Sequence, residues 1–398
     1  MERWPRDATW QKMGLLGSLY VAQHIPLTFV YEALPVFLRQ QNVSLRTLGL
    51  LQLLALPLVF KFLWSPLIDR YGITRWGHYR VWILFFQIGL GIAIAILAFL
   101  NITQQFTLLL IGLLMVSLLS ASQDIATDAL AIGLLSPAER GFGNGIQRGG
   151  NSLGAIIGGG GMLILLGYWG WRNTLLAMAT ILLLTVIPAA RHRERIIKST
   201  ISSPPSFRRL VSVYRRPGMG RWLIILMLYG IGPYMALTMF RPLLVDIGLS
   251  MGEIGLLLGV VSYGAGLLGA VAAGLNISRL GRKQALIIFS ALQGIAIAAY
   301  CLPALGFTQL PMLYLVAMIA QFINGMAMTA LFTVMMDNSE AITAGTDYTV
   351  QSSVVYISGI IGATCSGVIT EAIGYSGVFA IALSFAAITV LVISYLFR

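Results

Sequence analysis

Charged side chains are scarce in this chain of 398 residues, where they make up 10% of the total against 58% hydrophobic residues. A soluble domain needs a charged, wetted surface, so this composition excludes an ordinary soluble protein. The two cysteines, Cys301 and Cys365, both lie inside apolar runs, which indicates neither a disulfide framework nor a metal site. The chain also lacks a Gly-x-x-x-x-Gly-Lys-[Ser/Thr] loop, so ATP is not expected to drive movement, and no cofactor is expected.

Long apolar runs make up most of the chain instead. A helix needs about 20 apolar residues to cross the hydrocarbon layer of a membrane. Twelve segments meet this requirement: residues 13–38, 45–67, 79–100, 106–135, 142–168, 171–189, 221–243, 252–277, 284–305, 310–336, 345–371 and 374–396. The sequence therefore predicts an all-α membrane protein with twelve transmembrane helices.

Basic residues gather on one side of these predicted spans. They precede the first span, join the second to the third and the eighth to the ninth, and are densest in the linker from Arg191 to Arg221. The positive-inside rule then places both termini and the linker in the cytoplasm. This topology accounts for the net charge of +12, so no nucleic-acid partner is expected.

The linker divides the chain into two halves that resemble one another. SPLIDRYGITR begins at Ser65 after the second span, and GLNISRLGRK begins at Gly274 after the eighth, about 209 residues apart when Asp69 is aligned with Ser278. Repeated halves are typical of transporters that move around a site near the membrane midplane. The predicted domains are residues 1–190 and 221–398, six helices each, with the basic linker 191–220 between them.

The two loops resemble the signature G-x-L-a-D-R-x-G-R-K, which joins the second and third helices in the major facilitator superfamily. The second copy matches at Gly274, Arg279, Gly281, Arg282 and Lys283. The first copy matches at Leu67, Asp69, Arg70 and Gly72. The stretches KFLWSPLIDR, SASQDIATDALA, PAERGFGNGIQ and AGTDYTVQSS are similar to one branch, which holds AmpG-type muropeptide permeases, acetyl-CoA transporters and RhtX/FptX siderophore importers.

The resemblance implies the major facilitator fold, two pseudo-symmetric six-helix bundles that work by alternating access, with helices one, four, seven and ten lining the cavity. It assigns to the conformational gate Asp69, Arg70, Gly72, Arg279, Gly281 and Arg282. Small residues at four-residue spacing let helices approach closely. The resemblance places such a glycine surface where helices five and eight meet, at Gly150, Gly154 and Gly158. It assigns Gln147 and Asn151 beside them to the cavity wall.

Six titratable side chains lie inside the predicted spans: His24, Glu32, Lys61, Asp124, Asp128 and Arg148. A charge in the bilayer is costly unless it faces protein or a wet cavity, so these side chains should point inward. Spans three, six, nine and twelve carry no charge in their interiors, as expected of helices that face lipid.

Depth below the cytoplasmic surface predicts which of these groups meet. At about 1.5 Å per residue, Lys61 and Arg148 reach a depth near that of Asp128, so these three are expected to be partners. Asp124 lies deeper, with Gln123 beside it, and is expected to face the transport cavity and to couple protons to the solute. His24 also lies near the midplane and can either relay protons or serve as an ordinary hydrogen-bonding residue. Glu32 approaches the outer face. The alternative interpretation is that the charges on helices two, four and five only neutralise one another in a structural network.

The expected function is transport without covalent chemistry, and no catalytic or metal-binding residue is assigned. An intramembrane enzyme is the rival class, but the chain has no Gly-x-Ser-x-Gly with a serving histidine and no paired-histidine metal motif. A passive channel is a third class, but repeated halves with glycine surfaces fit a transporter with alternating access better. The chain is expected to be a monomeric proton symporter of the inner membrane.

The solute expected first is an iron–siderophore complex. The stretches GNGIQRGG and GTDYTVQ resemble the siderophore importers, and the twelve predicted spans lack the additional helices of AmpG-type permeases. Muropeptide, or another peptide-like or CoA-like metabolite, is the alternative.

Overall fold

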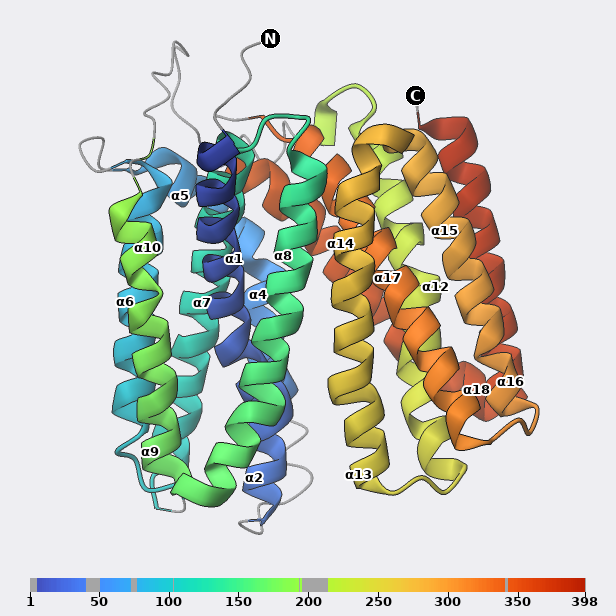
Figure 1. Cartoon of the computed structure of the whole chain (residues 1–398), viewed down its shortest axis with the longest axis horizontal. Coiled ribbons are helices and arrows are strands. Elements are labelled where there is room, and N and C mark those ends of the chain that lie inside the picture. Colours follow the sequence, from blue (N-terminus) through green and yellow to red (C-terminus); the bar gives the residue numbers. More distant parts are fainter. Residues whose placement is uncertain are drawn as a thin grey trace. The chain divides into compact units, whose positions relative to one another are not determined.

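The computed structural model describes residues 6–40, 51–72, 77–102, 104–192, 194, 214–340 and 343–397. Every regular element in these ranges is a helix (Figure 1). Nine helices in the same ranges are long and apolar enough to cross a membrane. The all-α membrane fold expected from the sequence is therefore confirmed.

The helices follow the predicted spans closely. Those of the first half are α1 (Arg6–Thr28), α2 (Leu34–Gln40), α4 (Leu56–Phe60), α5 (Ser65–Arg70), α6 (Tyr79–Leu97), α7 (Phe106–Leu134), α8 (Arg140–Ala155), α9 (Met162–Leu184) and α10 (Val186–Arg191). Those of the second half are α12 (Met219–Asp246), α13 (Met251–Ile254), α14 (Ser262–Leu280), α15 (Arg282–Ala299), α16 (Cys301–Ala304), α17 (Leu310–Asp337) and α18 (Ala344–Leu396).

The continuous helical stretches Arg140–Arg191 and Ala344–Leu396 each contain two of the predicted spans. Gly170 in α9 has φ 70°, and Gly374 in α18 has φ 75°. These values lie in the left-handed region that favours glycine, so each residue breaks its helix. Another predicted span, residues 45–67, begins outside the described residues and continues as short helices, so its crossing of the membrane stays a prediction.

Contacts divide the chain into two compact units. The first consists of Met1–Ser136, Gly150–Leu210 and Ser339–Thr349. The second consists of Pro137–Gly149, Val211–Asn338 and Val350–Arg398. Each unit therefore includes a short stretch from the other half of the sequence. The division into residues 1–190, 191–220 and 221–398 stays a prediction, and positions 195–213 of the linker lie outside the described residues.

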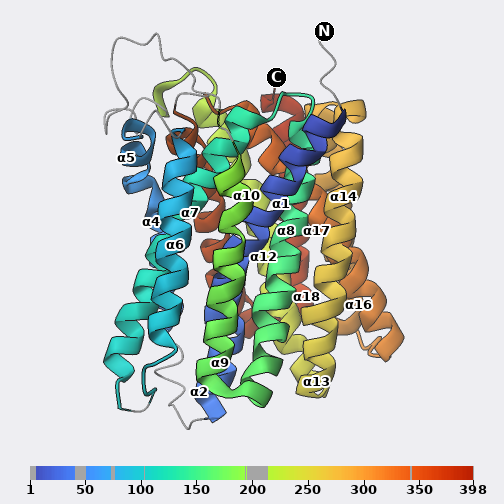
Figure 2. The same cartoon turned by 60° about the vertical axis from the view of Figure 1, so that its left-hand side comes forward.

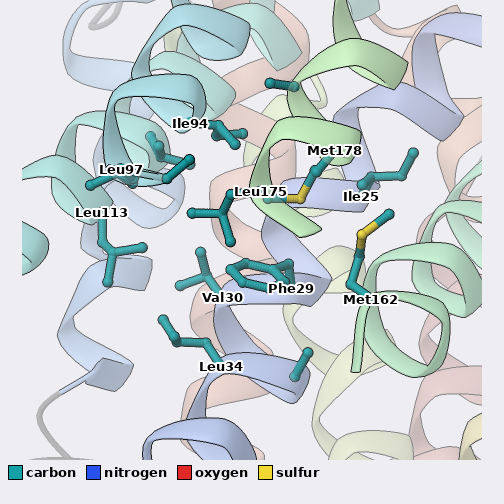
Figure 3. Packing of buried hydrophobic residues seen from close by; sticks show 14 of the residues in the cluster. Ile25, Phe29, Val30, Leu34, Ile94, Leu97, Leu113, Met162, Leu175 and Met178 are labelled. Atoms are coloured by element: carbon teal, nitrogen blue, oxygen red, sulfur yellow. The ribbon is translucent and has the colours of Figure 1, made fainter. Parts of the chain in front are cut away.

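The first unit packs around an apolar cluster contributed by α1, α6, α7 and α9 (Figure 3). Phe29 and Val30 come from the π-helical turn that follows α1, and Leu34 begins α2. They face Leu113 of α7 and Leu175 of α9. In both views α6 runs beside α7 and α9 (Figure 1, Figure 2). This cluster fixes the positions of α1 and α7, which carry most of the polar side chains described below.

The second unit has its own apolar cluster, contributed mainly by α12, α15, α17 and α18. Helix α17 also packs closely against α14. The contact of α17 with α14 depends on glycine. A Cβ atom at Gly269 would lie 1.9 Å from the Phe322 carbonyl oxygen, and one at Gly325 would lie 2.2 Å from the Gly266 carbonyl oxygen. Side chains at these two positions would push the helices apart.

The glycines of α8 and of the π-helical turn that follows it, Ile156–Gly161, present two different faces, which corrects the single surface expected from the sequence. A Cβ atom at Gly150, Gly154 or Gly158 would meet α1, with Val21 and Ile25 carbonyl oxygens at 2.7 Å and 2.2 Å for the last two. Contacts with α14 come instead from other glycines of α8: Gly141, Gly145 and Gly149. The four-residue spacing indicated a close helix contact correctly, but spacing alone does not specify the partner helix.

We expect Gly154→Leu to destabilise the first unit by about 1–3 kcal/mol or more, because the new side chain must displace α1. The midpoint of thermal unfolding in detergent should fall. Gly160→Ala is the matched control, since no atom lies within 4 Å of the added Cβ. An unchanged midpoint for Gly154→Leu would contradict the packing of α8 on α1.

Candidate functional site

A group of buried polar side chains connects α1, α7 and the broken helix between residues 56 and 70 in the first unit. We call it the polar cluster, and its members are Tyr20, Gln23, Lys61, Asp124 and Asp128. Helices α1 and α7 run antiparallel, since Gln23 contacts Asp124 and, one turn away, Tyr20 contacts Asp128. The i and i+4 carboxylates of α7 therefore do share one face, as the sequence predicted.

Lys61 is brought into the cluster by a break in its helix. Pro57 lies at the start of α4 and Pro66 at the start of α5, and a short 3₁₀ turn, Lys61–Leu63, joins the two. Proline lacks an N–H donor and clashes with the preceding turn, which favours a break in the helix here. The Lys61 side chain is 1% exposed and points toward α7.

Asp124 is the direct partner of Lys61. The Lys61 ammonium forms an ion pair with Oδ2 of Asp124, whose side chain is 9% exposed. The Gln23 amide donates a hydrogen bond to Oδ1 of the same carboxylate. Both oxygens of Asp124 are thus engaged, which a buried carboxylate requires.

Asp128 has different neighbours. The Tyr20 hydroxyl donates a hydrogen bond to Oδ1 of Asp128 at 3.0 Å. The Lys61 ammonium also interacts electrostatically with this carboxylate. Lys61 therefore acts on two carboxylates one helical turn apart and is ion-paired directly with the deeper one.

The sequence predicted that Lys61 is a partner of Asp128 and that Asp124 faces the cavity. Lys61 does interact with Asp128, but its direct ion pair is with Asp124, which the sequence did not predict. The depth count assumed 1.5 Å per residue, whereas a 3₁₀ turn rises about 2.0 Å per residue. Three residues in this turn add only about 1.5 Å of depth, so the choice of Asp124 depends on the direction that the helix break gives the Lys61 side chain and not on depth alone. The contact predicted between Arg148 and Asp128 stays a prediction, because Arg148 belongs to the second unit.

A neutral polar network lies behind the polar cluster. Gln123 donates to the side-chain oxygen of Gln87 on α6, and Gln87 donates to the Leu182 carbonyl at 3.0 Å and to the Thr185 hydroxyl at 2.5 Å. These bonds set the rotation of α7 that directs Asp124 toward Lys61. Sequence reasoning missed Gln87, although a single glutamine in the otherwise apolar third span was a usable signal.

The remaining predicted pathway residues are dispersed. His24 is half-buried on α1 beside Gly154, and Glu32 is exposed in a π-helical turn, Phe29–Ala33, close to Gly159. Gln147 is buried and Asn151 half-buried on α8. Their assignment to a solute or proton pathway stays a prediction.

Asp69, predicted as a gate residue, caps the start of α18 inside the first unit. Its carboxylate accepts hydrogen bonds from the Tyr79 hydroxyl at 2.8 Å, the Gly345 N–H at 3.0 Å, and the Thr346 N–H and hydroxyl at 2.7 and 2.6 Å. An anion at a helix N-terminus accepts hydrogen bonds from the free N–H groups and interacts favourably with the positive end of the helix dipole. Burial raises the pKa of the Asp69 carboxyl, and these four hydrogen bonds oppose that rise.

We expect Asp69→Asn to lower the free energy of unfolding by about 1.5–3 kcal/mol, because the amide NH₂ cannot accept from the N–H groups that the carboxylate binds. Thermal unfolding in detergent measures the change. Tyr79→Phe, which removes one neutral donor, is the control and should have a smaller effect. Equal midpoints for parent and Asp69→Asn would show that the cap contributes nothing.

The second unit has an ionic counterpart. Asp337, at the end of α17, accepts from Arg140 at 2.8 Å and from Arg282 at 2.7 Å. Arg282 also donates to the Pro137 carbonyl at 2.5 Å, and Gly281 before it has φ 81°, which ends α14. Sequence reasoning identified Arg282 and Gly281 but missed Asp337.

The other predicted gate residues make local contacts. The Arg70 guanidinium lies 5.3 Å from the centre of the Tyr71 ring. Gly72 packs against the His78 ring, and Arg279 lies in the last turn of α14. Their gating roles stay predictions.

The sequence profile of the Major Facilitator Superfamily matches residues 16–363. The chain belongs to this superfamily. The resemblance found in the loops and in the polar stretches is thereby confirmed. A facilitator of this kind is a membrane transporter, so the rival reading as an intramembrane enzyme is set aside.

Relatives of this facilitator include named permeases. The anhydromuropeptide permease of Escherichia coli (strain K12) is 30% identical over 372 residues, which cover 92% of this chain and 75% of the permease. A putative transporter AmpG 4 of Rickettsia conorii is 24% identical over 71% of each chain.

Solved structures agree on the fold. The transporter FucP in an outward conformation has a TM-score of 0.76 at 16% identity. The match covers 98% of this chain and 100% of the FucP chain. The human organic anion transporter MFSD10 has a TM-score of 0.71 at 17% identity, with coverage of 98% of this chain and 100% of its own.

Proposed function

We propose that this facilitator imports a small organic solute together with protons, and that the Lys61–Asp124 pair couples the two. One observation carries the proposal: a buried ammonium acts on two carboxylates one turn apart on the same helix. Ionisable groups inside a membrane protein are costly, and they commonly mark ion or proton paths. A pair that served packing alone could be replaced by apolar side chains at little loss.

The geometry supplies a simple coupling step. A proton bound by Asp124 removes the negative charge that holds Lys61. The ammonium is then attracted mainly to Asp128, and the segment that carries Lys61 shifts along α7. Release of the proton restores the first arrangement, so proton binding selects between two arrangements of the broken helix.

We further propose that the protein resides in the inner membrane with both termini in the cytoplasm. The basic residues of the predicted loops support this orientation. The orientation would be tested by fusing a reporter enzyme to each terminus.

An anhydromuropeptide or similar peptide-bearing solute is our first candidate substrate. It is supported by the 30% identity with the E. coli permease that is named for that substrate. An iron–siderophore complex, the first expectation from the sequence, becomes the second candidate. It is supported by the resemblance of GNGIQRGG and GTDYTVQ to siderophore importers.

Uptake into proteoliposomes tests both candidates side by side. Labelled anhydromuropeptide and a siderophore loaded with radioactive iron are presented under an acidic outer pH. We expect one of them to accumulate above its outside concentration, and a protonophore to abolish the accumulation. Accumulation that is indifferent to the protonophore would refute proton coupling, and failure of both probes would refute both substrate candidates.

A further inference from the structure

Arg148 is a charged residue that the proton-coupling step does not use. It lies on the part of α8 that belongs to the second unit. Its guanidinium stands over the ring of Phe332 on α17, 5.6 Å from the ring centre. It also interacts electrostatically with the Tyr234 hydroxyl on α12. Three helices of this unit thus converge on one cation and two aromatic rings.

No carboxylate of the second unit's described residues forms an ion pair with Arg148. Asp337 is held by Arg140 and Arg282, Asp246 accepts from Tyr375, and Glu253 binds Ser250. Glu371 is exposed on α18. Glu139 precedes Arg148 by nine positions, or ~13 Å along a helix.

The Arg148 side chain also has a hydrogen-bond donor that is not used within the described residues. Its Nε atom is buried and has no hydrogen-bond partner among the described residues. A half-buried cation without a counter-ion is costly in a membrane protein, and a cation–π contact offsets only part of that cost. By contrast, Arg140, eight positions earlier on the same helix, is ion-paired with Asp337. The difference singles out Arg148 as a cation that lacks an anion from its own unit.

Tyr234 packs closely against a glycine. A Cβ atom at Gly359 would lie 3.1 Å from the Tyr234 ring, so the ring packs directly on the α18 backbone. Guanidinium donors form a planar fork that suits a carboxylate, and the adjacent rings suit an apolar group attached to it.

We propose that Arg148, with Tyr234 and Phe332, binds a carboxylate of the transported solute. This inference rests on the proposed transport function and narrows its substrate class to organic acids with an apolar or aromatic group near the carboxylate. A peptide with a free C-terminus meets that description, and a neutral metal chelate does not. Arg148 is therefore a specificity-determining residue, separate from the proton site.

Binding of a minimal probe tests the site without any transport. Benzoate and benzamide have the same ring, but only benzoate carries a carboxylate. We expect benzoate to raise the thermal midpoint of the purified full chain more than benzamide does. Arg148→Gln should reduce benzoate affinity by about 10- to 100-fold, the usual range for a charge-assisted hydrogen-bonded contact, and abolish the difference.

Arg148→Lys keeps the positive charge and therefore the fold, but it loses the planar fork, so it should bind benzoate with intermediate affinity. Arg140→Gln, the matched control, should lower the midpoint of the free protein and leave the benzoate preference intact. Equal effects of benzoate and benzamide on the parent would overturn the proposal. So would a benzoate preference that survives in Arg148→Gln.

A transport arm separates this inference from the proposed function. For any labelled peptide solute that is taken up, Arg148→Gln should raise KM for the free acid and leave KM for its C-terminal carboxamide unchanged. If no solute is taken up while benzoate binding depends on Arg148, the proposed substrates fail and the carboxylate site stands. If a solute is taken up with the same KM by parent and Arg148→Gln, the carboxylate site fails and transport stands.

Discussion

Lys61→Met alone is expected to destabilise the protein by about 3–5 kcal/mol, because it leaves Asp124 as a buried charge without its direct partner. The loss should be seen as a lower midpoint of thermal unfolding in detergent and as reduced yield in the membrane. Gln23 would still donate to Asp124, but one neutral amide does not compensate for a lost ammonium. This is the largest stability effect that we expect in the first unit.

A second substitution identifies the partner. Lys61→Met combined with Asp124→Asn removes both charges of the direct ion pair and should recover much of the lost stability, because of these buried charges only Asp128 remains, and Tyr20 still donates to it. Lys61→Met combined with Asp128→Asn is the matched control, and it should recover much less, since the direct ion pair is with Asp124. Equal recovery in the two double variants would contradict Asp124 as the direct partner. Equal stability of all variants would mean that the pair does not exist in the membrane.

The largest functional effect is expected from the same double variant. Lys61→Met with Asp124→Asn should exchange labelled solute for unlabelled solute across a vesicle membrane, because exchange requires no net proton movement. It should not accumulate solute against a gradient. With one proton per solute, a difference of one pH unit supports at most about tenfold accumulation, and in this variant the ratio should fall to about one.

Use of the double variant keeps the experiment interpretable, since it removes both members of the direct ion pair together. Asp128→Asn tests the second position of the ammonium, because it leaves the Lys61–Asp124 pair and an acceptor for the Tyr20 hydroxyl in place but removes the carboxylate that attracts Lys61 once Asp124 is protonated. Its uphill accumulation should fall as well, while exchange continues. Normal uphill accumulation by the Lys61→Met, Asp124→Asn protein would exclude this pair as the coupling site and direct attention to His24 and Glu32.

The helices could be predicted closely because their signal is local. The spans predicted at 79–100, 106–135 and 310–336 are the helices Tyr79–Leu97, Phe106–Leu134 and Leu310–Asp337. A membrane helix satisfies its own backbone hydrogen bonds and exposes apolar side chains, so its length and composition appear directly in the sequence. Gly170 and Gly374 then separate adjacent spans without a long loop, which explains why two predicted boundaries lie inside continuous helical stretches.

The site was only partly predictable. Lys61, Asp124 and Asp128 were identified because a charge in an apolar run is conspicuous. Gln23 and Gln87 were missed, since single neutral polar residues are common in membrane helices. The face occupied by Gly154 was assigned to the wrong helix, because regular glycine spacing indicates a close contact and not the identity of the neighbour.

By itself the sequence determined that this chain is an all-helical membrane protein, where most of its helices begin and end, and which residues carry costly charge. These properties depend on composition over one helix length. Tertiary structure alone decided that Lys61 pairs directly with Asp124, that Asp69 caps α18 more than 270 positions away, and that Arg148 lies over Phe332. Such contacts depend on helix breaks, on rotations of one turn and on neighbours distant in the chain, and no local pattern encodes them.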